Sequence, residues 1–83
     1  MGLKKARKDM KKFQKERGWE KFNTPKNLML SLNVEAGELL SLVEWMNDEQ
    51  VGKALENPDF FRAVKEEIGD VFHHLLNLCN QID

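Results

Sequence analysis

Two segments of the chain carry apolar side chains at helical spacing, and in each a carboxylate lies within the apolar stripe. An α-helix advances about 100° per residue, so residues three and four apart share one face. In residues 25–46 the stripe around Glu35 consists of Leu28, Leu32, Leu39, Leu42 and Met46. In residues 59–82 the stripe around Glu67 consists of Phe60, Val64, Val71, Leu75, Leu78 and Ile82. An ionised carboxylate in an apolar setting is costly unless it is paired or binds a metal.

Each of these carboxylates is followed one turn later by a second one at the edge of the stripe. The two pairs read Glu35-x-x-Glu38 and Glu67-x-x-Asp70. All four carboxylates converge if the two helices pack together, and divalent cations would relieve their repulsion. Hard oxygen ligands without cysteine favour Mg²⁺, with Mn²⁺ as a substitute. The alternative is that the four are ordinary surface charges on helices whose buried face lies elsewhere.

The first half of the chain predicts two helices. The first runs over about residues 3–17 and ends at Gly18, because glycine tolerates the left-handed conformation that terminates helices. The second runs over about residues 25–46, with Thr24 as its N-cap and Pro25 at its first position. Trp45 then lies on the same helix edge as Glu38.

The second half predicts a short helix and a long one. The short helix runs over about residues 48–55 with Asp48 as its cap. Pro58 forces the residue before it out of the helical region, so we expect Asp59 to cap a last helix that runs to the C-terminus. No strand pattern is present. The predicted fold is a single all-α domain over residues 1–83, with two long antiparallel helices, an N-terminal helix and a short connecting helix.

Both long helices are also apolar beyond the stripes that hold the carboxylates. The second apolar flank consists of Met29, Ala36, Leu40, Val43, Phe61, Ile68, Phe72 and Cys79. A chain of 83 residues with a single cysteine has little core and no internal disulfide to stabilise it. We therefore expect a homo-oligomer, in which neighbouring chains complete four-helix-bundle-like cores.

The formal net charge of −1 combines a basic and an acidic part. Residues 1–17 hold eight basic and two acidic residues, and residues 18–83 hold five basic and twelve acidic ones. The basic helix raises the alternative of a nucleic-acid-binding module, since phosphates bind lysine-rich surfaces. An apolar stripe of Leu3, Ala6, Met10 and Phe13 favours packing on the acidic body instead, so a nucleic-acid partner is not expected.

The chain also lacks the features of exported and membrane proteins. No run reaches the roughly 18 apolar residues that a membrane span needs, and the basic N-terminus lacks the apolar region of a signal peptide. Together with the free thiol of Cys79 and 33% charged residues, this predicts a cytoplasmic protein.

The motifs resemble those of the all-α nucleoside triphosphate pyrophosphohydrolases, the MazG-like superfamily, whose signature is ExxE followed by ExxD. Glu35-Ala-Gly-Glu38 and Glu67-Ile-Gly-Asp70 match it, and the resemblance covers residues 13–82. The chain is most similar to the short MazG-like and dCTP pyrophosphatase group. The resemblance implies Mg²⁺-dependent hydrolysis of nucleoside triphosphates to a monophosphate and pyrophosphate. It further implies cleaning of the dNTP pool with a dCTP-type or broad dNTP preference, by a homodimer or homotetramer.

The resemblance also implies roles for single residues. Glu35, Glu38, Glu67 and Asp70 would be the metal ligands and catalytic groups, with Glu35 as ligand or as base. By the same resemblance, Trp45 would stack on the base, and His74, which stands where relatives often have tyrosine, would contact the sugar or phosphate. The chemistry of their own side chains suggests Asn23 and Asn77 for a base edge and Lys26 for a phosphate, although relatives often carry histidine at the position of Asn23. The structural alternatives are a core or interface Trp45, a His74 that hydrogen-bonds Asp70, and a solvated Lys26. A non-catalytic helical oligomer is the remaining alternative for the whole chain.

Overall fold

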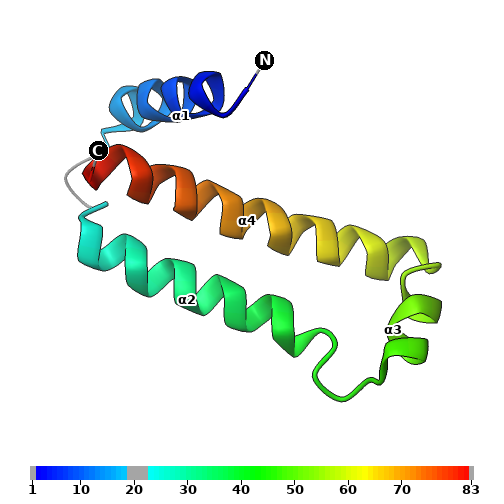
Figure 1. Cartoon of the computed structure of the whole chain (residues 1–83). Coiled ribbons are helices and arrows are strands. Elements are labelled where there is room, and N and C mark those ends of the chain that lie inside the picture. Colours follow the sequence, from blue (N-terminus) through cyan, green and yellow to red (C-terminus); the bar gives the residue numbers. More distant parts are fainter. Residues whose placement is uncertain (1, 19–22, 83) are drawn as a thin grey trace.

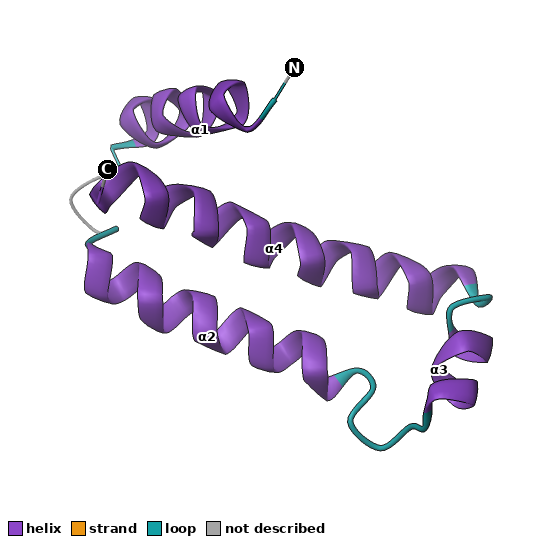
Figure 2. Cartoon of the chain, in the orientation of Figure 1, coloured by secondary structure: helices purple, strands orange, loops and turns teal. Residues whose placement is uncertain are grey.

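The apolar stripes of the chain meet along one long central helix. The computed structural model describes residues 2–18 and 23–82, whose regular structure is entirely helical. The helices are α1 (Leu3–Arg17), α2 (Pro25–Ser41), α3 (Asp48–Ala54) and α4 (Pro58–Ile82). α4 packs against α1 on one side and antiparallel to α2 on the other (Figure 1). α3 stands at the end of the pair where α2 finishes and α4 begins (Figure 2). The predicted all-α fold is confirmed.

The predicted ends of α1 and the predicted start of α2 are also confirmed. Gly18 ends α1 in the left-handed conformation with φ 67°, and its N–H group bonds to Lys15 O at 3.1 Å. Thr24 caps α2, since its Oγ1 accepts from the Asn27 N–H group at 3.2 Å, and Pro25 occupies the first helical position. These local rules depend only on neighbouring residues, which explains why the sequence suffices for them.

The prediction that the second helix continues to residue 46 is wrong, since α2 ends at Ser41. The Ser41 hydroxyl donates to the Glu38 carbonyl oxygen at 2.6 Å, the acceptor that the next turn of the helix would use. The Leu42 N–H group bonds to Leu39 O instead, at 3.3 Å, and the Val43 N–H group bonds to Leu40 O at 3.0 Å. Residues 42–45 therefore form a turn, and Trp45 is not a helical residue.

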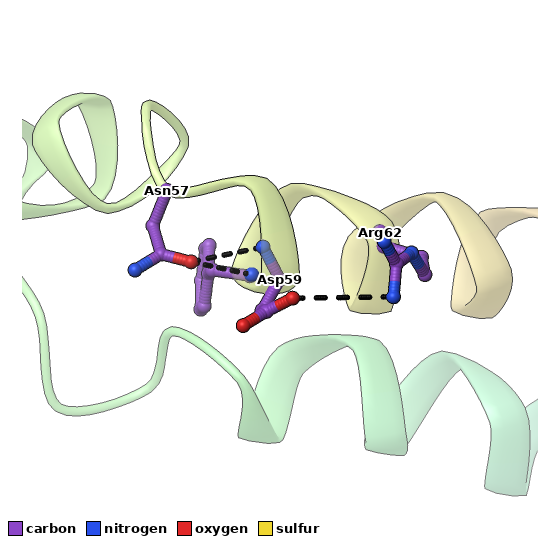
Figure 3. A network of polar contacts seen from close by, with 4 residues as sticks. Asn57, Asp59 and Arg62 are labelled. Carbon is purple, nitrogen blue, oxygen red and sulfur yellow. Dashed lines mark hydrogen bonds and ion pairs between the residues drawn. The ribbon is translucent and has the colours of Figure 1, made fainter.

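The predicted caps of α3 and α4 are each displaced to an asparagine. Asn47, not Asp48, caps α3 in a reciprocal pair with Gln50, with both bonds at 2.8 Å. α4 begins at Pro58, and the Asn57 side chain accepts from the N–H groups of Asp59 at 2.9 Å and Phe60 at 3.2 Å (Figure 3). Because Pro58 keeps Asn57 out of the helix, that side chain is free to bond the first turn.

The hydrophobic core of the described residues is small. Leu28 and Leu76 are its buried hydrophobic side chains. Large apolar side chains are exposed on the flanks of α2 and α4, among them Met29, Leu40, Phe61, Ile68 and Phe72. Among the described residues, none of the helices combines the length and the hydrophobicity that a membrane span requires. The packing of α2 on α4 therefore buries few apolar side chains and leaves the apolar flanks of both helices exposed.

Candidate metal centre between α2 and α4

The antiparallel packing of α2 on α4 brings carboxylates from both helices together. One oxygen each from Glu35, Glu38 and Glu67 lies within 4.8 Å of the other two. Glu35 and Glu38 reach the group from successive turns of α2, and Glu67 reaches it from α4. The helical periodicity predicted this convergence, because the first carboxylate of each pair lies on the face that the two helices bury against each other.

The residues present suit a divalent cation. Glu35 and Glu67 are half-buried, and each has an oxygen, Oε2, that is covered and has no hydrogen-bond partner among the described residues. Covered polar atoms without a partner are rare in folded proteins, because each loses its bonds to water without replacement. A cation that takes carboxylate oxygens would satisfy both, and an all-oxygen set favours Mg²⁺ or Mn²⁺.

The crowding of carboxylates alters the acidity of Glu67. Its desolvation raises the pKa to about 7, and a hydrogen bond with the Glu35 carboxyl group adds to the effect. The negative charges of Glu38, Glu35 and Asp70 raise the pKa further. Without a cation, Glu67 therefore holds a proton at pH values where an ordinary glutamate has lost it.

Asp70 does not join the three carboxylates in the structure. It is exposed on α4, one turn after Glu67, and lies outside the group with mutual distances below 4.8 Å. Its charge still acts on Glu67, whose pKa it raises. Three of the four predicted ligands are therefore assembled, and the fourth lies on the rim.

His74 lies beside the group, but it faces Glu35 and not Asp70, the carboxylate that the sequence suggested as its hydrogen-bond partner. Its Nε2 atom is 4.0 Å from Glu35 Oε1 across the helix pair. A hydrogen bond to Asp70 was the expected structural role, because Asp70 is one turn away on the same helix. The sequence does contain a pattern that could have predicted this position. His74 follows Glu67 by seven residues, or about two helical turns, so both side chains lie on the face of α4 that meets α2.

The other residues implied in substrate binding are spread along the molecule. Trp45 is 90% exposed in the turn after α2, and Lys26 is exposed in the first turn of α2. Asn23 is half-buried and donates to Gln14 Oε1, while Gln14 and Asn77 are buried on the faces of α1 and α4. The hydrogen bond between Asn23 and the buried Gln14 joins α1 to the segment just before α2, and the sequence did not predict it.

Comparison with known proteins finds similar chains by both sequence and structure. The chain is 40% identical over 67 residues to dCTP pyrophosphatase 1 of Bos taurus, and equally to that of Homo sapiens. These alignments cover 81% of this chain but only 40% and 39% of the two relatives. The chain thus spans about two fifths of the length of the curated relatives it matches.

A solved structure covers more of the molecule. A pyrophosphatase from Archaeoglobus fulgidus superposes with a TM-score of 0.82 at 35% sequence identity, covering 94% of this chain and 71% of that chain. No family model matches the sequence.

Proposed function

We propose that this chain, which belongs to the MazG-like family of all-α pyrophosphatases, hydrolyses nucleoside triphosphates to a monophosphate and pyrophosphate with Mg²⁺. Deoxynucleoside triphosphates are the proposed substrates, with a dCTP-type or broad preference, because the two relatives that are 40% identical to this chain are dCTP pyrophosphatases. The proposed role is removal of surplus or modified nucleotides from the dNTP pool.

The observation that carries the proposal is the group of three carboxylates from two helices. One oxygen from each lies within 4.8 Å of the other two, and Glu35 and Glu67 each have a covered oxygen without a hydrogen-bond partner among the described residues. Such a group is unfavourable by itself, since like charges at this distance repel. A structural oligomer that has lost catalysis has no need of it, whereas an enzyme that binds metal-complexed phosphates does.

The residues of the group have separable parts in the proposed reaction. Glu35, Glu38 and Glu67 would hold Mg²⁺, with Asp70 as the fourth ligand from the rim. The cation would neutralise negative charge of the triphosphate and lower the pKa of a bound water. A carboxylate of the group accepts the proton of the attacking water, and the two with covered oxygens, Glu35 and Glu67, are the candidates. No side-chain nucleophile is needed.

Trp45 is the proposed stacking partner of the base. Its side chain is 90% exposed, which leaves the ring available, and stacking of a base on an aromatic ring is worth about 1–3 kcal/mol. Trp45→Ala is therefore expected to raise the KM for every base about tenfold or more with a smaller change in kcat. An unchanged KM would assign Trp45 to an interface instead. Asn23, Asn77, Lys26 and His74 stay candidates for further substrate contacts.

The experiment that tests the function is a screen for pyrophosphate release. The purified chain is incubated with Mg²⁺ and each of the four dNTPs and four NTPs, with chelator as the matched control. We expect pyrophosphate from at least one dNTP and none in chelator. A complete panel without pyrophosphate would contradict the proposal.

The active unit is proposed to be a homodimer or homotetramer. The apolar side chains exposed on α2 and α4 include Leu40 at 60%, Met29 at 53% and Ile68 at 52%, and exposed apolar surface of this extent marks an interface. Light scattering is expected to give a multiple of the 9.7 kDa mass of one chain. Replacing Ile68 with lysine should shift that mass toward 9.7 kDa, and a monomer in the unaltered chain would contradict the prediction.

A further inference from the structure

The side chain of His74 lies next to the group of Glu35, Glu38 and Glu67 without belonging to it. His74 Nε2 lies 4.0 Å from Glu35 Oε1, across the interface of α4 with α2. The two side chains are only 25% and 22% exposed. The other ring nitrogen of His74, Nδ1, is covered and has no hydrogen-bond partner among the described residues. Nε2 is therefore the nitrogen that faces the acidic group.

His74 is not placed as a ligand. Glu35, Glu38 and Glu67 are the residues whose oxygens lie within 4.8 Å of one another, and neither nitrogen of His74 belongs to that set. Within residues 2–18 and 23–82, the ion pairs of Lys and Arg involve other carboxylates. His74 thus offers Glu35 a donor that the ion pairs of the described Lys and Arg residues do not supply.

Carboxylates that bind metals are commonly held in place by a hydrogen bond from outside the coordination sphere. Removing such a partner typically weakens metal binding about 10–100-fold. Glu35 has a covered Oε2 without a partner among the described residues, and its Oε1 faces the Nε2 atom of His74. The separation of 4.0 Å exceeds a hydrogen bond, and contacts of this kind tighten when a site fills.

We propose that His74 is a positioning residue of the metal centre: its Nε2–H group donates to Glu35 Oε1 and fixes the orientation of that carboxylate relative to Glu38 and Glu67. The inference rests on the proposed function, because it concerns the same carboxylates. It differs from a contact to the nucleotide, since it operates before any nucleotide binds.

The test is a titration of the nucleotide-free chain with Mn²⁺. The electron paramagnetic resonance signal of the unbound ion measures how much Mn²⁺ binds. His74→Leu keeps the apolar bulk and removes the donor, so its Mn²⁺ dissociation constant is expected to rise about tenfold or more. His74→Gln should bind Mn²⁺ nearly as well as the unaltered chain, because its terminal amide nitrogen replaces Nε2. The matched control is His73→Leu, since His73 is adjacent but lines a cavity between α4 and α1 with Met10 and Phe13. That control should bind Mn²⁺ unchanged.

Each other result overturns the inference in a distinguishable way. Equal Mn²⁺ affinity of His74→Leu and the unaltered chain overturns it alone, and a raised nucleotide KM in that variant would then assign His74 to the substrate. An unaltered chain that binds no Mn²⁺ overturns both the inference and the proposed function. If circular dichroism shows that His74→Leu is unfolded, His74→Gln is compared with His74→Asn, whose amide is too short to reach. Equal Mn²⁺ affinity of those two variants overturns the inference.

Discussion

Glu38→Gln is expected to lower kcat/KM for the preferred dNTP by at least about 100-fold, the loss typical when one group that stabilises transition-state charge is removed. Glu38 is exposed, so the substitution leaves the packing of α2 on α4 intact. It removes one negative charge from a group whose oxygens lie within 4.8 Å of one another. The variant should therefore lose activity while the metal-free chain becomes no less stable. The measurement is steady-state pyrophosphate release, with a thermal melt in chelator.

The matched control for this prediction is Glu66→Gln. Glu66 is exposed on α4, directly before Glu67, and lies outside the acidic group. The control removes the same charge from the same pair of helices, so it should retain nearly full activity. A Glu38→Gln variant that keeps more than half of the activity would show that Glu38 does not hold the cation.

The contribution of Glu67 to the stability of the metal-free chain is expected to be lost between pH 5 and pH 8, and Mg²⁺ should restore stability. Crowding raises the pKa of Glu67 from 4.5 to about 7 in the folded chain. The folded chain therefore binds this proton more tightly than the unfolded chain. Its contribution to stability is complete below pH 4.5 and is lost as the pH rises through about 7. At pH 8, Mg²⁺ at 100 times its dissociation constant adds about 2.7 kcal/mol, which raises the Tm by about 10 °C or more.

Comparison with Glu67→Gln isolates this effect from other titrating groups. Burial lowers the pKa of His73, and the positive charge of His74 lowers it further, so His73 stabilises the fold increasingly as the pH rises through 6.5. That contribution is common to both proteins and cancels in the difference between their melting curves. The difference should change between pH 5 and pH 8 in chelator. If the difference between the two melting curves does not change with pH, the pKa of Glu67 is not raised in the folded chain.

The helix pattern and the convergence of the carboxylates could be predicted from the sequence for one physical reason. Both follow from periodicity, which depends on residue spacing alone. Glu35 and Glu67 each interrupt an apolar stripe, and the structure places both at the interface of α2 and α4. The left-handed Gly18 and the Thr24 cap likewise depend only on neighbouring residues.

The features that escaped prediction depend on competition between bonds or on contacts across helices. The hydroxyl of Ser41 donates to the Glu38 carbonyl oxygen, and α2 ends about one turn earlier than predicted. The spacing of apolar residues does not predict such a hydrogen bond. The approach of His74 to Glu35 joins two helices whose relative register is set only by packing. The exposed position of Asp70 belongs to the same class, since the rotation of α4 against α2 decides it.

The most direct test of the central claim is to identify which phosphate bond breaks. The chain is incubated with dCTP and Mg²⁺ and followed by ³¹P nuclear magnetic resonance, with chelator and Glu38→Gln as controls. We predict resonances of dCMP and pyrophosphate that grow together and disappear in both controls. Formation of dCDP and orthophosphate, or pyrophosphate release that survives chelator and Glu38→Gln alike, would contradict hydrolysis at a metal centre built from the carboxylates of α2 and α4.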